Sequence, residues 1–175
     1  DTKAAAWYKQ TRGIVLAMGA THYTYGFRKE PYSRMQHVGV EFKTKRAAFG
    51  ASYLGDFRWG RPGFATLIDL SFDGAKNYNY YGVGNDTVEG DDVFTEADQQ
   101  LFEAFPSVLA YENPRRTLWF AFGPEIKYSR SSAADDTLIA TTKPYGYGDF
   151  GQVGVRLKVE VNTRGRMLLG MGPAA

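Results

Sequence analysis

Residues 151–164, GQVGVRLKVEVNTR, decide the fold. Apolar residues occupy every second position from 153 to 161, and most positions between them are polar or charged. Because side chains alternate between the two faces of a strand, the stretch predicts one long β-strand with an apolar face and a charged face. The alternation runs for more than about ten residues, close to the length that a tilted strand needs to cross a bilayer. The apolar face carries Val153, Val155, Leu157, Val159 and Val161.

Composition excludes several classes of protein. The chain has 175 residues and a mass of 19.5 kDa, which is enough for one domain, and its mean hydropathy is −0.39. No run approaches the roughly eighteen apolar residues of a membrane helix, so a helical span is excluded. The absence of cysteine excludes a disulfide scaffold and thiol catalysis, and a net charge of +2 is too small to indicate nucleic acid. The 15% aromatic content and the 20 glycines suit a barrel with aromatic girdles and tight turns.

Seven further segments show a strand pattern, so the sequence predicts about eight strands. In 36–44, for example, the face with Val38, Val40 and Phe42 opposes a polar face, and in 47–59 only Leu54 breaks the alternation. Pro106 interrupts another segment, where we expect a bulge. The seven segments are 13–25, 36–44, 47–59, 64–73, 78–85, 99–111 and 117–129.

The predicted connections alternate in length. Residues 26–35, 86–98 and 130–147 form long polar loops, residues 45–46, 74–77 and 112–115 form short joins, and only GRPG at 60–63 breaks the series. Short turns at one end and long loops at the other are typical of an up-and-down barrel in an outer membrane. Residues 1–12 show no clear period, and we expect a lead-in segment or a short helical turn there.

Five motifs resemble one family. They are GFRKEPY (26–32), FATLIDLSFDG (64–74), NYYGVGNDT (79–87), GPEIKYS (123–129) and VRLKVEVNTR (155–164). Together they resemble the bacterial surface-antigen superfamily of outer-membrane barrels, typified by the assembly factors BamA and TamA. The resemblance implies an antiparallel transmembrane β-barrel of sixteen strands in the outer membrane of a Gram-negative bacterium, with a structural role or a role in protein assembly or translocation.

The resemblance covers about half of such a barrel. We therefore expect a lead-in over residues 1–12 and an incomplete outer-membrane barrel domain over residues 13–175. Bare strand edges in lipid leave backbone groups without partners, so either more of the same polypeptide, closure as a small barrel, or other protein chains must complete the wall. We favour a longer polypeptide. The expected partners are outer-membrane lipid and other protein chains that complete the barrel or dock on it, and nucleic acid is not expected.

No catalytic, cofactor-binding or metal-binding residue is predicted, and no cofactor is expected. His22 and His37 are the only histidines, too few for a zinc site, and no G-x-S-x-G elbow surrounds Ser52, Ser71, Ser107 or Ser129. An alternative is a small lipid hydrolase that uses His22 or His37 with a serine, and another is a soluble ligand-binding barrel. The acidic residues Glu89, Asp91, Asp92 and Glu96 suit a solvated loop better than a calcium site.

The charged face predicts a lumen network, and the apolar face predicts lipid contact. Replacing Leu157 by arginine is expected to cost about 2–4 kcal/mol if that side chain faces the middle of a bilayer. Gly82 and Gly84 indicate a tight strand end and not a nucleotide loop. Basic residues that belong to the barrel rim or contact anionic lipid are Arg28, Lys29, Arg34, Lys45 and Arg46. The lumen network comprises Glu41, Lys43, Asp56, Arg58, Asp69, Glu125, Lys127, Arg156, Lys158 and Glu160.

Overall fold

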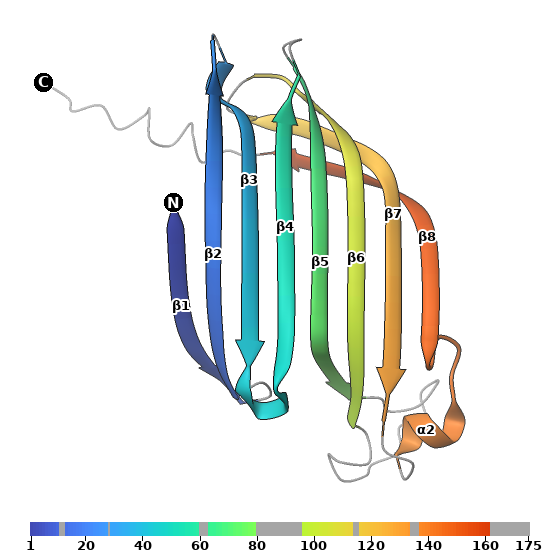
Figure 1. Cartoon of the computed structure of the whole chain (residues 1–175). Helices are drawn as coiled ribbons and strands as arrows, with labels where there is room; N and C mark the ends of the chain where they lie inside the picture. Colours follow the sequence, from blue (N-terminus) through green and yellow to red (C-terminus); the bar gives the residue numbers. More distant parts are fainter. Residues whose placement is uncertain are drawn as a thin grey trace, which may run out of the picture.

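Eight antiparallel strands form a single sheet in chain order (Figure 1). The computed structural model describes residues 1–10, 13–27, 29–59, 63–79, 96–113, 116–133 and 137–161. The strands are β1 (Thr2–Lys9), β2 (Gly13–Gly26), β3 (Lys29–Lys43), β4 (Ala48–Arg58), β5 (Phe64–Asn79), β6 (Glu96–Tyr111), β7 (Leu118–Ser132) and β8 (Asp149–Val161). A short 3₁₀ helix, η1 (Thr44–Arg46), joins β3 to β4, and the helix α2 (Leu138–Thr142) lies between β7 and β8.

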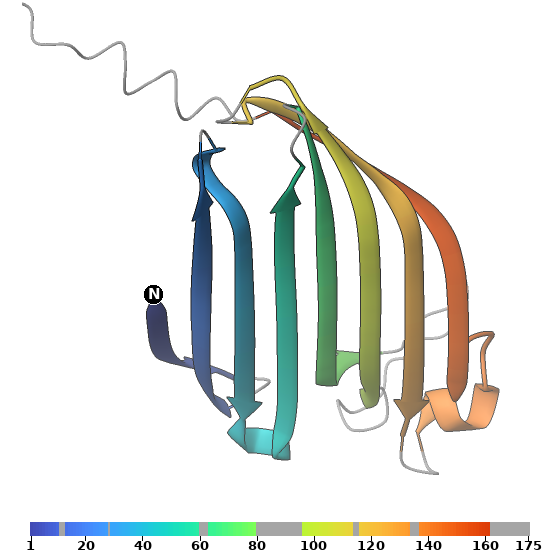
Figure 2. The same ribbon diagram turned by 45° about the horizontal axis from the view of Figure 1, so that its top comes forward.

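The sheet is open. Each strand pairs with the next one in the sequence, and the described residues show no pairing between β1 and β8, which lie at opposite ends of the row (Figure 2). An all-β, up-and-down sheet of this kind is consistent with a partial β-barrel. Among the helices of the described residues, none has the length and the apolar composition that crossing a membrane requires.

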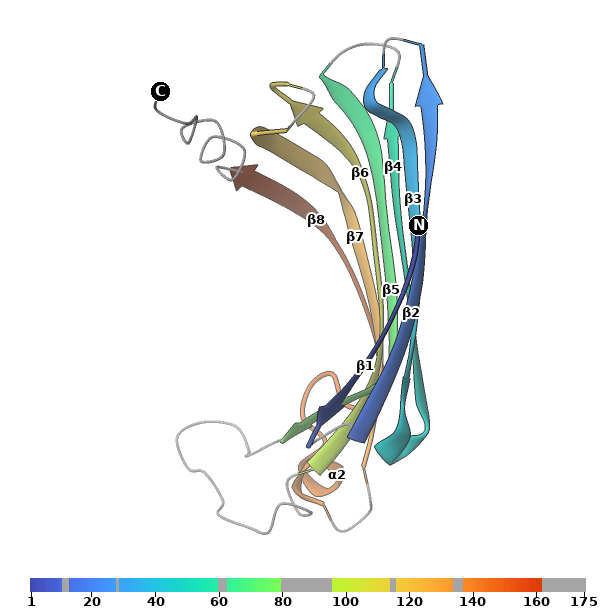
Figure 3. The same cartoon turned by 90° about the vertical axis from the view of Figure 1, so that its left-hand side faces the viewer.

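The sheet separates an apolar face from a polar face. Directly paired residues share a face, so the pairs Phe42–Phe49 and Phe102–Tyr128 extend the apolar face, whereas Glu103–Lys127 belongs to the polar face. The upper ends of β6, β7 and β8 curve to one side (Figure 3). Three charged residues of the polar face, Lys43, Asp56 and Arg58, are buried, whereas most large side chains of the apolar face are exposed. We call the polar face the concave face and the apolar face the outer face.

The connections confirm the predicted separation of short and long joins only in part. At the upper end (top of Figure 1), residues 27–28, 59–63 and 112–117 join β2 to β3, β4 to β5 and β6 to β7. At the lower end, the joins are residues 10–12, 44–47, 80–95 and 133–148. Both long connections therefore leave the same end of the sheet. GRPG at 60–63 belongs to the upper end with the other short joins there, but the short joins 10–12 and 44–47 leave the lower end together with the two long connections.

Several predicted elements were wrong. Residues 1–12, without periodicity, contain β1, because the alanine-rich strand is fixed by its pairing with β2 and not by its own pattern. The long loop expected at 26–35 is a tight hairpin, with β3 beginning at Lys29. The join expected at 74–77 lies within β5, which continues to Asn79, so residues 78 and 79 do not begin a separate strand, and residues 80–85 lie outside the described residues. The unpredicted strand β1 and the predicted strand that instead continues β5 offset each other, so the predicted and observed numbers of strands are both eight.

The expectation at Pro106 was also wrong. β5 pairs with β6 in one register through Pro106, and the register shift in that pair falls between Asp73 and Lys76. Proline has no backbone N–H to donate, and the pairing of β6 with β7 is interrupted between Ala104 and Val108 without an inserted residue. Pro106 therefore weakens one ladder and leaves the register of both unchanged.

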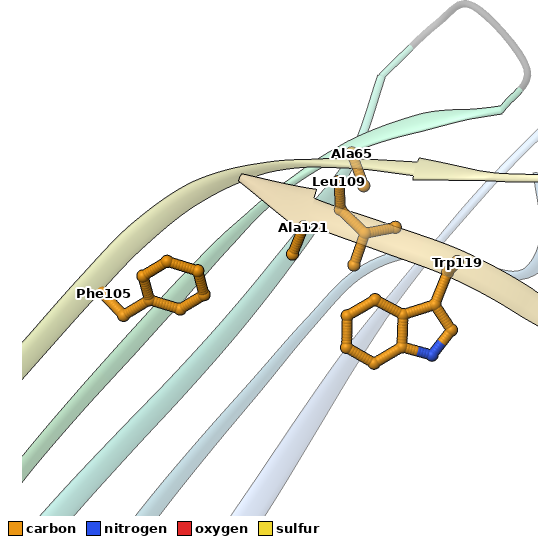
Figure 4. Packing of buried hydrophobic residues seen from close by; sticks show 5 residues of the cluster. All are labelled: Ala65, Phe105, Leu109, Trp119 and Ala121. Atoms are coloured by element: carbon orange, nitrogen blue, oxygen red, sulfur yellow. The ribbon is translucent and has the colours of Figure 1, made fainter. Parts of the chain in front are cut away.

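A small hydrophobic cluster lies on the concave face at the upper end. Figure 4 shows its five members, which come from β5, β6 and β7. Leu67 and Tyr111 pack against it. The cluster exists because the curved upper ends of β6 and β7 bring their inward side chains together. Its members are Ala65, Phe105, Leu109, Trp119 and Ala121.

Candidate functional site

The concave face holds the candidate site, and its most buried charge is Asp56 at the upper end. The Asp56 residue is 0% exposed. Its carboxylate accepts two hydrogen bonds from Arg116, of 2.6 Å from Nη1 and 2.8 Å from Nη2, and a third of 2.8 Å from the Tyr32 hydroxyl. This bidentate geometry satisfies a buried carboxylate well, because an arginine fork matches its two oxygens. The three donors come from β3 and from the connection between β6 and β7.

Aromatic rings complete this upper centre. The Arg58 guanidinium carbon lies 4.6 Å from the centre of the Tyr32 ring and 5.4 Å from that of Tyr111. The Arg116 guanidinium carbon lies 4.8 Å from the centre of the Tyr111 ring. A cation over an aromatic face is stabilised by the ring quadrupole, most strongly where water is excluded. The upper centre, defined as Tyr32, Asp56, Arg58, Tyr111 and Arg116, thus joins four separate segments of the chain.

A second buried charge, Lys43, lies at the lower end. The residue is 1% exposed, and its ammonium group contacts Glu41 Oε1 at 2.9 Å and also binds Asp73. The side chains of Glu41 and Asp73 are 30% and 27% exposed. One buried cation therefore lies between two carboxylates that water still reaches.

A hollow of about 560 Å³ opens beside Lys43 on the concave face, over β1 to β6. Small residues on neighbouring strands line much of it, and the charged or titratable side chains at its border include His37, Glu41 and Glu103. The small side chains leave the space that longer ones would fill. These small residues include Ala5, Ala17, Gly19, Gly39, Gly50, Ser52 and Ser71.

Glycines leave room where neighbouring side chains lie flat across the sheet. A Cβ on Gly19 would come within 2.9 Å of His37 Cε1, and one on Gly50 within 2.7 Å of Glu41 Cγ. A methyl group there would push each side chain away from the strand. The glycines therefore set the positions of the polar groups around the hollow.

A row of ion pairs crosses β6, β7 and β8. Lys127 contacts Glu103 at 3.1 Å and Glu125 at 3.3 Å, and Arg156 contacts Glu125 at 3.1 Å. Lys158 contacts Glu160 at 3.6 Å. These side chains are partly exposed, so each pair contributes little to stability and the row mainly sets the charge of the wall. Ion pairs among charged residues that alternation assigned to one face are thus present along the concave face of the sheet.

The prediction of the charged network included one exposed residue without a recorded ion pair in the described part of the chain and omitted three that form ion pairs. Asp69 is exposed and no ion pair is recorded for it within the described part of the chain, although it lies on the predicted face. Arg116 was not predicted, because it lies in a connection and its partner Asp56 is 60 positions away. Asp73 and Glu103 follow the same alternation as the predicted members and were detectable from that pattern.

The histidines and serines do not form a catalytic arrangement. Thr21 Oγ1 and His37 Nδ1 share a hydrogen bond of 2.8 Å on the concave face. His22, the next residue after Thr21, lies on the outer face, so the two histidines occupy opposite faces. A Cβ on Gly39 would lie 2.6 Å from Ser52 Oγ and 3.6 Å from His37 Nε2. Ser52 and His37 therefore border the same spot, but within the described residues the structure records no hydrogen bond between them and no carboxylate on Nδ1.

The remaining predicted serines are structural. Ser71 lines the hollow. Ser107 is buried and donates a hydrogen bond of 3.4 Å to the Leu67 carbonyl, and Ser129 is buried on β7. Neither of the two buried serines is near a histidine in the sheet register. A hydrolase centre is therefore not assembled on these side chains.

No cluster of metal-ligating side chains occurs among the described residues. Glu89, Asp91 and Asp92 of the acidic loop lie outside the described residues, as do Gly82 and Gly84, and Glu96 begins β6. Of the predicted rim residues, Arg34 is exposed on the outer face, and Lys45 donates a hydrogen bond of 3.3 Å to the Gln10 carbonyl. Arg28 and the side chains of Lys29 and Arg46 lie outside the described part of the structure, as do residues 162–175.

Comparisons with protein-family models, with curated proteins and with solved structures found no match for this chain. The arrangement itself indicates a wall with a charged inner surface, a hollow and two buried ionic centres. It offers surfaces for binding and for packing.

Proposed function

We propose that this chain is part of the wall of a transmembrane β-barrel in a bacterial outer membrane. The observation that carries the proposal is the exposed apolar outer face. On β8, for example, Val153 is 77% exposed and Val159 is 52% exposed. A soluble ligand-binding barrel keeps its apolar face inside, whereas here the concave face is polar and the outer face is apolar.

Aromatic residues border the apolar face at two levels. The lower level runs along β3 to β7, where Phe42 pairs with Phe49 and Phe72 with Phe102. The upper level includes Trp59 and Phe64, whose rings stack with centres 5.9 Å apart. The lower level comprises Phe42, Phe49, Phe72, Phe102 and Tyr128, and the upper level comprises Phe57, Trp59, Phe64, Phe120 and Phe122.

The spacing of the two levels fits a membrane. Phe64 and Phe72 are eight positions apart on β5, and Phe49 of β4 and Trp59, which directly follows β4, are ten positions apart. At about 3.4 Å per residue and a tilt of about 40°, these spacings correspond to a height of roughly 20–26 Å, close to the apolar band of about 25 Å in membrane barrels. Between the levels lie mainly aliphatic side chains, and Tyr53, the aromatic exception, donates a hydrogen bond of 3.4 Å to Gln36.

Polar residues lie on the outer face near both ends of the sheet, at the lower end for example Arg130 and its pairing partner Asp149. At the upper end, His22 pairs with Gln36, and Thr24 pairs with Arg34, which is level with Phe57 of the upper aromatic level. Polar and basic side chains near the end of a membrane strand reach the head groups by extending along the surface. The upper end, with its short connections, then faces the periplasm, and the long connections face the cell exterior.

The open sheet supports a larger wall. The free edges of β1 and β8 would be unpaired in lipid, so further strands must cover them. The motif resemblance to the surface-antigen superfamily favours a sixteen-stranded barrel with a role in protein assembly or translocation, and outer-membrane lipid and docking chains are its partners. Depletion of the protein should lower the amount of other folded barrels in the outer membrane, whereas a purely structural wall would leave that amount unchanged.

Two neighbouring substitutions on β8 test the membrane location. Val153→Arg places a charge on the outer face, and Gln152→Arg places the same charge on the concave face. In lipid vesicles, Val153→Arg should lower the free energy of unfolding by about 2–4 kcal/mol, and Gln152→Arg should change it by less than about 1 kcal/mol. Denaturant titration of the whole protein measures both values. Equal and small effects would mean that the outer face does not contact lipid.

A simpler measurement comes first. The folded protein, extracted with detergent from outer membranes, should migrate differently on a gel before and after heating. Migration that does not change, together with recovery in the soluble fraction, would contradict the proposal before any variant is made.

A further inference from the structure

We propose that the upper ends of β6 and β7 form a cover over the upper end of the concave face, and that the contact between Arg116 and Asp56 holds this cover closed. We call residues 106–111 and 118–123 the arch. This conformational role goes beyond the proposed function and does not depend on whether the outer face contacts lipid.

The arch has a weak point at its base. Pro106 on β6 lacks an N–H, and the ladder between β6 and β7 is interrupted between the pairs Ala104–Ile126 and Val108–Phe122. On the facing strand, Gly123 packs directly against the Pro106 carbonyl and is followed by Pro124. Fewer ladder hydrogen bonds make this level easier to bend than the regular parts of the two strands.

The arch covers the hydrophobic cluster. Leu109 and Trp119 of the arch point to the same side as Ala65 of β5 (Figure 4), and Ala65 is 0% exposed. Lys158 of β8 lies over the Trp119 ring, with its ammonium nitrogen 4.8 Å from the ring centre. If the arch straightens, Ala65 loses this cover and becomes accessible to water.

The Arg116–Asp56 contact ties the arch to the sheet. Arg116 lies in the connection between β6 and β7, two residues before β7 begins, whereas Asp56 lies on β4, two strands away from β6. Arg116 adopts a left-handed backbone conformation with φ of +53°, an uncommon conformation for a residue with a side chain. The closed position is therefore held at one point by two hydrogen bonds to a buried carboxylate.

The closed position also has an internal cost. Arg116 Nε is buried and has no hydrogen-bond partner within the described part of the chain. A buried donor without a partner disfavours the state that buries it. Opening would expose this nitrogen to water and at the same time break the pair with Asp56. The unpaired Nε favours opening and the pair with Asp56 favours closure. Because these two contributions oppose each other, small changes in either one shift the equilibrium between the closed and open positions of the arch.

Thiol labelling tests the cover. The chain has no cysteine, so Ala65→Cys places one reporter beneath the arch. Ala48→Cys is the matched control, because Ala48 is 8% exposed on the concave face at the opposite, lower end. Each reporter is combined with Asp56→Asn in the whole protein, and the rate of reaction with a charged maleimide is measured.

Asp56→Asn should accelerate labelling of the Ala65→Cys reporter by at least about tenfold, because removal of one partner from a buried ion pair shifts equilibria by more than that factor. Labelling of the Ala48→Cys reporter should not change. Arg116→Lys keeps the charge and loses the fork, so it should give a smaller acceleration at the Ala65→Cys reporter.

Two results would overturn the proposal. Unchanged labelling of the Ala65→Cys reporter would show that the pair does not hold the arch, and equal acceleration of both reporters would show that it stabilises the whole sheet instead. Asp69→Asn, the same substitution at an exposed carboxylate of the same face, should leave both rates unchanged.

Discussion

The two ends of the concave face each bury one charge, and they do so in different ways. Asp56 at the upper end is held by donors from separate segments and lies beside a hydrophobic cluster. Lys43 at the lower end is buried as deeply, but its partners Glu41 and Asp73 border an open hollow. The difference shows that burial of a charge alone does not fix its contribution to stability.

The stability lost when one charged partner is removed depends on the partner that remains. The loss is large when the remaining charged side chain is buried and cannot be hydrated. Arg116 is mostly enclosed and contacts the Tyr111 ring, whereas the two carboxylates around Lys43 are about a quarter or more exposed. The upper end should therefore behave as a packed centre and the lower end as a hydrated one.

Truncation of the two charges should give the largest difference. Asp56→Ala should lower the free energy of unfolding by about 3–5 kcal/mol, because it leaves the enclosed Arg116 without its partner. Lys43→Ala should lower it by only about 1–2 kcal/mol, because Glu41 and Asp73 gain water instead. Denaturant titration of the folded protein compares the two. Equal losses would contradict the distinction between the two ends.

Two leucines on β6 allow the upper and lower ends of the concave face to be compared with uncharged side chains. Leu109 is 1% exposed in the hydrophobic cluster, and Leu101 is half-buried on the same face beside the hollow. Leu109→Ala should cost about 3 kcal/mol, within the range of core truncations, and Leu101→Ala less than about 1.5 kcal/mol because no closed cavity forms. The same titration measures both, and the reverse order would show that the cluster is not a packed core.

Much of the sheet was predictable because apolar and polar residues alternate within most strands, whatever their pairing partners. The opposition of Val38, Val40 and Phe42 to His37, Glu41 and Lys43 is the arrangement found, and Leu54 lies on the polar face as the pattern required. β1 was not predictable, since its run of alanines has no alternation and the pairing with β2 fixes it. The polar hairpin between β2 and β3 was missed because composition resembled a loop.

The sequence alone could not predict that the residues of the upper centre lie together. Asp56 and Arg58 were assigned to the polar face from their spacing, but Tyr32 lay in a segment interpreted as a loop, and Arg116 lay just after a predicted turn and outside the predicted strands. The contact between Arg116 and Asp56 depends on the curvature of β6 and β7, which local patterns do not encode. Pro106 was recognised as a disturbance, and its effect is an interrupted ladder instead of the expected bulge.

Two glycines, one towards each end of the concave face, allow the two ends to be compared by adding a single methyl group. A Cβ on Gly123 would lie 2.8 Å from Ser107 Cα and closer still to the Pro106 carbonyl oxygen, so the backbone of β6 would have to move. A Cβ on Gly50 would meet only the Glu41 side chain, which can turn into the hollow. Gly123→Ala should therefore cost about 1–3 kcal/mol. Gly50→Ala should cost less than about 1 kcal/mol, since reduced freedom of the unfolded chain offsets part of the loss. Denaturant titration again decides: if Gly50→Ala proves as costly as Gly123→Ala, the lower end is as tightly packed as the upper end, and the contrast between the two ends fails.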